Sequence, residues 1–156
     1  SDAVTLVKSP RIYNSDGIYT KKSQLGLVVQ TADCMPILMS DKKRIGAIHS
    51  GWRGLKNNIV QKAIKKFDVN QLFISIGPHA QSCCYEIKDD VKNHFVDYTE
   101  FRKGNLYLNM SQILKDLSKK ENFKIEVSPI CTICNNSYNS YRENKTSDRQ
   151  FGIIWR

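Results

Sequence analysis

The residues best suited to chemistry lie in one stretch, residues 31–54, which reads TADCMPILMSDKKRIGAIHSGWRG. Cys34 precedes one apolar run of this stretch, and His49 ends the next. The short polar turn at residues 41–43 predicts an antiparallel hairpin, which would place Cys34 and His49 roughly opposite each other. A thiolate beside an imidazole is suited to act as a nucleophile with its base, or as two ligands of zinc or copper. A small buried thiol and a histidine that caps the next helix are the structural alternatives.

The chain continues from His49 through a glycine-containing turn into a predicted helix over residues 52–67. Its apolar positions repeat at helical spacing, at Leu55, Ile59, Ala63, Ile64 and Phe67. Unpaired backbone N–H groups at the start of a helix attract an anion, and Arg53 would add a bidentate contact to phosphate or carboxylate. A plain helix start with Trp52 in the core is the alternative, because the stretch has no phosphate-binding fingerprint.

The chain has five cysteines, and the other four stand apart from this stretch. Cys131 and Cys134 form a C-x-x-C, which is half of a zinc site or a redox pair. No second C-x-x-C completes a ribbon-type zinc site, so we favour two buried thiols near a loop. The loop around residues 77–86 has a histidine and two cysteines whose spacing suits metal ligands (His79, Cys83 and Cys84), although the apolar pattern that follows suggests that one cysteine packs inward.

Composition fits one globular domain without a membrane helix. The chain has 156 residues, of which 40% are hydrophobic and 25% charged. Its longest apolar runs, residues 25–29 and 35–39, fall far short of the ~20 residues that a membrane helix needs. No apolar leader segment occurs near its beginning, and the odd number of cysteines is typical of reduced thiols. We therefore expect a cytoplasmic protein with no membrane partner.

The net charge of +9, from 24 basic and 15 acidic residues, raises the question of nucleic-acid binding. The basic residues are scattered, and their densest pairs, residues 65–66 and 119–120, fall on predicted helix surfaces. A solvated surface is therefore the favoured interpretation, and a basic RNA- or DNA-binding module the least favoured. Attraction of anionic substrates remains open, because several arginines lie within motifs.

The elements that must position these residues alternate between strands and helices. A helix with Met110, Ile113, Leu114 and Leu117 on one face begins after Asn109, a plausible N-cap. A shorter helix is indicated over residues 91–98, and residues 14–17 read as a turn. Residues 132–150 form a long polar segment of the kind that often carries function. Together with strands expected over residues 4–7, 25–30, 35–40, 44–49, 72–76, 106–108, 123–127 and 151–155, this predicts a mixed α/β domain.

Four segments in this order resemble the laccase-domain family, whose members are also described as multicopper polyphenol oxidases, YfiH-like proteins and peptidoglycan editing factors. The segments are TADC-x-P, HSGWRG, GPHAQSCCYEI, and CT followed by SYRENKTSDR, which begin at Thr31, His49, Gly77, Cys131 and Ser140. Asp16, with Thr20 four residues on, is similar to the family's D-x-x-x-T. The resemblance covers nearly the whole chain.

The resemblance implies a four-layer α/β/β/α fold of the α/β (α+β) class with mixed sheets. Residues 1–156 would form a single laccase-like domain that lacks the family's N-terminal region. The family holds zinc with two histidines and one cysteine, and Cys34 and His49 match two of these ligands. The third belongs to a Q-V-H motif, whose histidine would fall just before Ser1, so the chain resembles a fragment. Neither His79 nor His94 matches a ligand position of the family.

The activity that the resemblance implies is phosphorolysis of adenosine, inosine, guanosine and methylthioadenosine, with deamination of adenosine. The partners would be purine nucleosides and phosphate, and the older polyphenol-oxidase description implies copper as an alternative metal. Arg53, Ser140, Arg142 and Arg149 are the expected contacts to phosphate or ribose, and Asp33 is a candidate general acid because it adjoins Cys34.

This chain departs from the family's F-S-Y-R-R-D-x-x-x-G-R pattern at several positions. Asn139 replaces an aromatic residue, Glu143 an arginine and Asp148 a glycine, which removes a stacking surface and positive charge.

A cysteine hydrolase acting on cell-wall fragments, with Cys34 as nucleophile and His49 as base, is the alternative enzyme.

Overall fold

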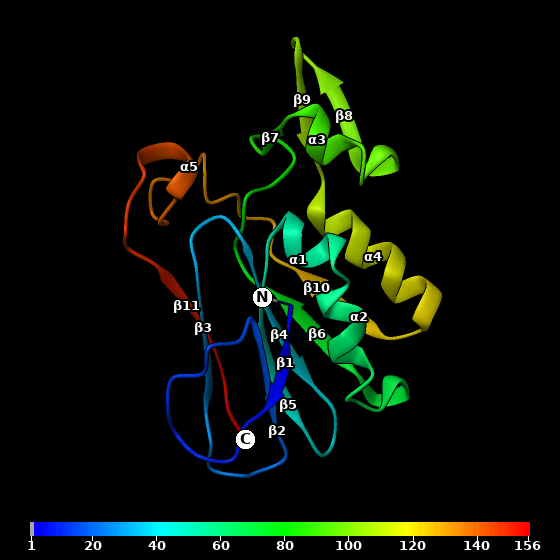
Figure 1. Cartoon of the computed structure of the whole chain (residues 1–156), viewed down its shortest axis with the longest axis vertical. Helices are drawn as coiled ribbons and strands as arrows, with labels where there is room; N and C mark the ends of the chain where they lie inside the picture. Colours follow the sequence, from blue (N-terminus) through cyan, green and yellow to red (C-terminus); the bar gives the residue numbers. More distant parts are fainter. Residues whose placement is uncertain (1) are drawn as a thin grey trace.

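A computed structural model describes residues 2–156, and a six-stranded mixed sheet forms its centre (Figure 1). The order across the sheet is β1-β2-β5-β4-β6-β10. The two outer pairs, β1 with β2 and β6 with β10, are parallel, and the inner pairs are antiparallel. The strands span Val4–Leu6 (β1), Gly17–Thr20 (β2), Met35–Ser40 (β4), Ile45–Ser50 (β5), Phe73–Ile76 (β6) and Lys124–Val127 (β10).

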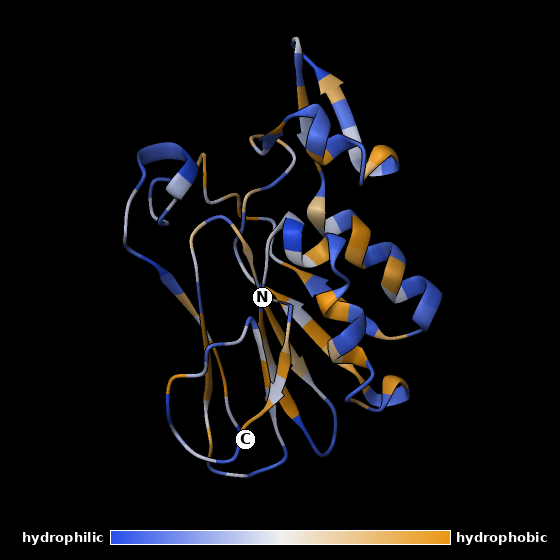
Figure 2. Ribbon diagram, in the orientation of Figure 1, coloured by the Kyte–Doolittle hydropathy of each residue, from blue (hydrophilic) through white to orange (hydrophobic). Residues whose placement is uncertain are grey.

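Both faces of this sheet are covered, which explains why β4 and β5 are apolar almost throughout. The helices α1 (Trp52–Lys56), α2 (Ile59–Ile64) and α4 (Met110–Glu121) lie on one face, and the antiparallel pair β3 (Leu27–Thr31) and β11 (Gln150–Ile154) on the other (Figure 1). Residues 2–156 thus supply three of the four layers that the resemblance implies: helices, the large sheet and a small sheet. Figure 2 shows apolar residues in orange on the strands of the large sheet and on the helices beside it, and the buried ones form two core clusters.

A third, small sheet extends beyond the end of the large one, at the top of Figure 1. It has the order β7-β9-β8 and is accompanied by the short helix α3. The polar segment after β10 contains one further helical turn, α5, before β11 begins. The bounds of these elements are Glu86–Ile87 (β7), Asp89–Lys92 (α3), Thr99–Arg102 (β8), Asn105–Leu108 (β9) and Tyr141–Asn144 (α5), with 3-10 turns at Val69–Gln71 and Val96–Tyr98.

The mixed α/β class and most of the long elements agree with the sequence prediction. Asn109 caps α4 as expected, since its side chain accepts a hydrogen bond of 3.1 Å from the backbone N–H of Gln112. The strands β2, β7 and β8 and the turn of helix α5 were missed, because each has at most four residues and shows no clear period. No helix within residues 2–156 is long and apolar enough to cross a membrane.

The single helix predicted over residues 52–67 is wrong, because the chain forms two short helices there. Asn57 ends α1, and Asn58 adopts the left-handed conformation, with φ 58° and ψ 36°, before α2 begins. Asparagine tolerates this conformation better than other non-glycine residues, so the Asn57-Asn58 pair breaks a helix that the apolar spacing alone would continue.

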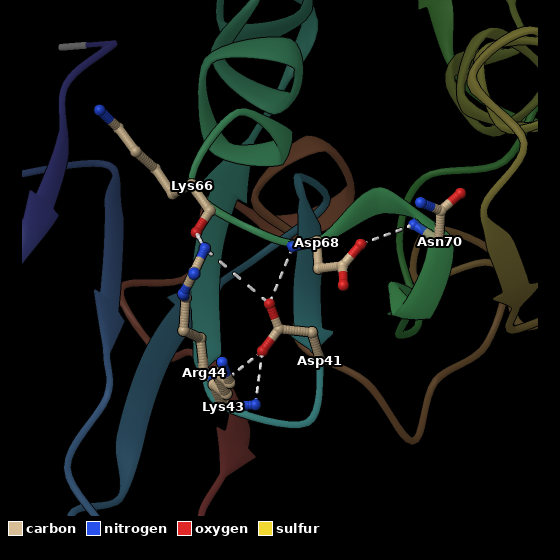
Figure 3. Close-up of polar contacts among 6 residues, drawn as sticks. All are labelled: Asp41, Lys43, Arg44, Lys66, Asp68 and Asn70. Atoms are coloured by element: carbon tan, nitrogen blue, oxygen red, sulfur yellow. Dashed lines mark hydrogen bonds and ion pairs between the residues drawn. The ribbon is translucent and has the colours of Figure 1, made fainter.

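The β4–β5 hairpin is fastened at its turn (Figure 3). The Asp41 carboxylate accepts hydrogen bonds from the backbone N–H groups of Lys43 (2.7 Å) and Arg44 (2.6 Å), and from that of Asp68 (2.9 Å). The Arg44 guanidinium donates to the carbonyl of Lys66 after α2. These contacts tie the turn to the helical layer, and the opposite end of the hairpin is left to form a site.

Candidate functional site

A pocket of about 450 Å³ lies where the chain enters β4 and leaves β5. This volume suits a small molecule. Its walls come from the segment before β2, the start of β4, the start of α1, the loop before β7 and helix α5. The polar and aromatic lining residues are Asp16, Asp33, Cys34, His49, Trp52, Arg53, Tyr85, Tyr141 and Arg142.

Cys34 and His49 both line this pocket, as the hairpin prediction required, but they do not face each other directly. The register pairs Pro36 with His49, so Cys34 comes opposite Gly51, two residues beyond the histidine. A Cβ atom at Gly51 would lie only 2.7 Å from the sulfur of Cys34. Glycine is therefore required where the chain passes the cysteine.

Asp16 holds the imidazole of His49 in place. The Nδ1 atom of His49 is 3.1 Å from a carboxylate oxygen of Asp16, and the backbone N–H of His49 donates to the Asp16 carbonyl at 2.7 Å. A carboxylate at Nδ1 favours a proton there, which leaves the Nε2 lone pair for a ligand. The sequence prediction did not place Asp16 in the site, although the D-x-x-x-T pattern was a signal for it.

The Cys34 thiol is held in its protonated form when no metal is bound. Burial, together with the carboxylates of Asp33 and Asp16, raises its pKa to about 11. The guanidinium groups of Arg142 and Arg149 lower the pKa and offset part of this effect. Such a thiol is a weak nucleophile at neutral pH. A metal ion that displaces its proton would convert it to a strong ligand.

Asp33 links three segments of the chain instead of facing the pocket with a free carboxyl. One carboxylate oxygen accepts a hydrogen bond of 2.8 Å from the Thr132 hydroxyl, and the other accepts one of 2.7 Å from the backbone N–H of Arg142. The residue is 4% exposed and has a positive φ of 78°. A carboxylate whose two oxygens both accept hydrogen bonds is suited to positioning, and the catalytic role of Asp33 stays a prediction.

Two arginines bring positive charge to the pocket wall. The guanidinium of Arg53 lies 4.5 Å from the ring centroid of Trp52. That of Arg142 lies 4.8 Å from the ring centroid of Tyr85 and donates to the carbonyl of Glu86 at 2.8 Å. Each guanidinium has five N–H donors, so both keep donors for an anion. Because α1 has only five residues, any anion site here depends on these side chains more than on the predicted long helix.

Two of the expected phosphate or ribose contacts have local structural roles. Ser140 caps helix α5, and its hydroxyl accepts a hydrogen bond of 3.1 Å from the backbone N–H of Glu143. The Arg149 guanidinium donates to the carbonyls of Thr146 (3.0 Å) and Asp148 (2.7 Å). Neither Ser140 nor Arg149 lines the pocket, so their contact with a substrate stays a prediction.

The four remaining cysteines lie together outside this pocket. The sulfur atoms of Cys83, Cys84, Cys131 and Cys134 are all within 4.8 Å of one another. Cys134 is exposed, so the prediction of two buried thiols is wrong for this residue. A search for a second C-x-x-C could not find this cluster. The partners of Cys131 and Cys134 are the adjacent residues Cys83 and Cys84, which lie in a loop far away in the sequence.

Sequence comparison finds relatives along the whole chain. The family described as multi-copper polyphenol oxidoreductase laccase matches residues 1–156. A protein of Aquifex aeolicus named purine nucleoside phosphorylase is 34% identical over 143 residues, which cover 89% of this chain and 69% of the relative. A protein of the same name from Borreliella burgdorferi is 34% identical over 157 residues, which cover 90% of this chain and 68% of the relative.

Solved structures share the fold. The hypothetical protein YfiH of Bacillus licheniformis superposes with a TM-score of 0.88 at 23% identity, over 99% of this chain and 71% of the other. YlmD of Geobacillus stearothermophilus superposes with a TM-score of 0.82 at 24% identity, over 90% of this chain and 60% of the other. These similarities support the mixed α/β architecture with mixed sheets.

Proposed function

Because the chain belongs to the multi-copper polyphenol oxidoreductase laccase family, we propose that its pocket catalyses phosphorolysis of purine nucleosides. The observation that carries the proposal is the meeting of Cys34 and His49 with Arg53 and Arg142 in one pocket of about 450 Å³. Relatives at 34% identity that are named purine nucleoside phosphorylase support the same activity. Adenosine, inosine, guanosine and methylthioadenosine are the proposed substrates.

Zinc is the metal that we propose for this pocket, with copper as the alternative. A thiolate and an imidazole are ligands that both metals accept, and the Asp16 carboxylate behind His49 is a typical outer partner of a metal-bound histidine. Cys34 and His49 would supply two ligands, and the family resemblance implies a further histidine ligand. When bound there, zinc would polarise a water molecule or an atom of the substrate.

The chain's own residues would bind and orient the two substrates. Arg53 and Arg142 are suited to hold phosphate through bidentate hydrogen bonds, and the rings of Trp52 and Tyr141 offer apolar surface for a purine. In phosphorolysis a phosphate oxygen bonds to the anomeric carbon of ribose while the bond from that carbon to the purine nitrogen breaks. The purine takes up a proton as it leaves, and ribose 1-phosphate remains.

The test is incubation of the zinc-supplemented protein with each nucleoside, with and without phosphate, and separation of the products by chromatography. We expect the free purine base and the 1-phosphate of the corresponding sugar only when phosphate is present. Cys34→Ser should reduce the rate at least about 100-fold. Arg142→Gln should mainly raise the KM for phosphate, and Lys88→Gln, which removes an exposed positive charge outside the pocket, is the matched control for lost charge.

Two outcomes would point elsewhere. Conversion of adenosine to inosine without phosphate would mean that deamination is the main reaction. Zinc-loaded protein that acts on no nucleoside would contradict the proposal. The cysteine-hydrolase alternative predicts that His49 activates Cys34 for alkylation at neutral pH, whereas the pKa of about 11 predicts slow alkylation that is the same in His49→Ala. Mass spectrometry of the peptide that contains Cys34 distinguishes the two.

A further inference from the structure

We propose that Cys83, Cys84, Cys131 and Cys134 form a second metal site, a tetrathiolate that binds one zinc ion. Their four sulfur atoms all lie within 4.8 Å of one another. The first two cysteines come from the loop that follows β6, and the other two from the loop that follows β10. The site is separate from the pocket proposed for phosphorolysis, because none of the four residues lines the pocket that holds Cys34 and His49.

The spacing of the sulfur atoms suits a ligand tetrahedron better than a disulfide. Zinc–sulfur bonds of about 2.3 Å place the four sulfurs of a tetrahedral site about 3.8 Å apart. The Sγ atoms of Cys83 and Cys134 are 4.0 Å apart. A disulfide between them would need a sulfur–sulfur distance of about 2.05 Å, roughly half of that separation.

Main-chain contacts hold the two cysteine loops together. His79 and Cys131 form a parallel β-bridge, in which the backbone N–H of Thr132 donates to the His79 carbonyl at 3.1 Å. The side-chain amide of Gln81 donates to the carbonyl of Ser128 at 3.0 Å. The loops are therefore placed by contacts that need no metal, and an ion would bind to ligands that are already close together.

The backbone also contacts the buried corner of the cluster. The N–H of Gln81 donates to the sulfur of Cys131 at 3.4 Å. This bond orients the Cys131 side chain toward the other three sulfur atoms and complements the negative charge that the sulfur would carry as a metal ligand.

A positive side chain lies beside the exposed corner of the cluster. The Arg102 guanidinium, on β8, donates to the carbonyls of Ser82 at 2.9 Å and Cys83 at 3.0 Å. Binding releases one proton from each of the four thiols, and four thiolates with Zn²⁺ carry a net charge of −2. Arg102 thus fixes the cysteine loop and lies where its charge offsets that of the loaded site.

The proposed zinc site would brace the walls of the first pocket. Tyr85 follows Cys84 directly and lies under the Arg142 guanidinium. Thr132 follows Cys131 directly and donates to the Asp33 carboxylate. An ion bound to all four cysteines would therefore hold the two loops that position Arg142 and Asp33, without any contact with the substrate.

The experiment is a titration of the reduced, metal-free full chain with Co²⁺ and then Zn²⁺. Two double variants separate the sites: Cys34→Ser with His49→Ala removes the pocket ligands, and Cys83→Ser with Cys134→Ser removes two exposed ligands of the cluster. In the first variant we expect sulfur-to-cobalt charge-transfer absorption that saturates at one equivalent and is lost on adding zinc. The second variant should bind zinc at the cluster at least about 100-fold more weakly.

Thiol protection in the unaltered chain gives a readout that needs no variant. Zinc should slow the reaction of Cys83, Cys84, Cys131 and Cys134 with a thiol reagent, mapped for each cysteine by mass spectrometry. Protection of Cys34 alone would overturn the proposal, as would a Cys83–Cys134 disulfide that forms in preference to zinc binding. Retention of iron in place of zinc, measured by elemental analysis, would overturn the assignment of the metal. If the protein binds zinc at the cluster but shows no phosphorolysis, the result counts against the proposed activity and leaves the zinc site supported.

Discussion

His49 depends on the carboxylate behind it, so the sharpest prediction for a single residue concerns Asp16. Asp16→Asn keeps the shape of the side chain but removes the negative charge that lies 3.1 Å from Nδ1 of His49 and favours a proton on that atom. We expect zinc affinity at the pocket and kcat/KM for phosphorolysis both to fall by about 10–100-fold. Zinc titration in a chain that also carries Cys83→Ser and Cys134→Ser measures the pocket alone.

The matched control for this change is Asp2→Asn, which removes a carboxylate from a surface ion pair with Lys62. It should alter neither quantity by more than about twofold. Equal zinc affinity and activity in Asp16→Asn and Asp2→Asn would show that Asp16 does not orient the histidine.

His79 makes folding stability depend on pH at the acidic side. Burial lowers its pKa below 6.5 and Lys115 lowers it further, against the raising effect of the hydrogen bond from Nδ1 to the Gly77 carbonyl. Below pH 6.5 the unfolded chain therefore takes up a proton that the folded chain resists. The contribution of neutral His79 to the free energy of unfolding is complete above pH 6.5. It decreases as the pH falls below 6.5 and is fully lost once the pH lies below the lowered pKa.

Uptake of one proton limits this loss to at most about 1.4 kcal/mol per pH unit. Urea unfolding of the unaltered chain and of His79→Leu at several pH values between about pH 5 and pH 7 measures how the free energy of unfolding depends on pH. The variant should show the flatter dependence. His94→Leu is the control, because His94 is exposed. Parallel curves for all three proteins would contradict the prediction.

At the scale of elements, Asn58 decides where one helix ends and the next begins. Its left-handed conformation, with φ 58°, costs residues with a branched or bulky side chain more than asparagine or glycine. We expect Asn58→Ala to lower the free energy of unfolding by about 1–2 kcal/mol and Asn58→Gly to change it by less than about 1 kcal/mol. Urea unfolding compares them, and a more stable Asn58→Ala would mean that α1 and α2 merge.

The elements that could be predicted are those with a strong period and a local boundary signal. The β4–β5 hairpin has two apolar runs around a polar turn, and α4 has an apolar face after its asparagine cap, so both follow from the sequence. The strands β7 and β8 are short and are defined by pairing with β9, a contact that no local pattern records. The prediction missed the helix break at Asn58, because the apolar residues keep their helical spacing on both sides of it.

At the scale of the whole molecule, the Asp33 carboxylate connects the first half of the chain to the last quarter. Thr132→Val removes its bond to one carboxylate oxygen and leaves that oxygen buried without a partner. We expect this change to lower the free energy of unfolding by about 1–3 kcal/mol. Thr31→Val is a matched control, because the hydroxyl of Thr31 is buried without a hydrogen-bond partner.

The control should be neutral or stabilising, since it removes an unsatisfied polar group from a site that is 2% exposed. Thermal unfolding of both variants at one pH decides the matter. If the two threonines respond alike, the Asp33 contact does not stabilise the fold.

Sequence reasoning could predict only those parts of the site that lie close together in the chain or match the motifs of the family. Cys34, His49 and Arg53 lie within one stretch of sequence, so their association follows from a single hairpin and the helix after it. Asp16 and Tyr85 enter the pocket from other segments. The cysteine cluster depends on the bridge between His79 and Cys131, a long-range pairing that spacing rules do not describe.

The two bonds of the Asp33 carboxylate also set an order of events during synthesis. They join residues 99 and 109 positions apart in the chain. Residues 35–50, which later form the β4–β5 hairpin, are synthesised on the order of 5–20 s of elongation before Arg142. For that interval Cys34 and His49 belong to a chain in which the Arg142 end of the pocket does not yet exist. A nascent chain would thus meet cellular metal and oxidants before its pocket has closed around these two residues.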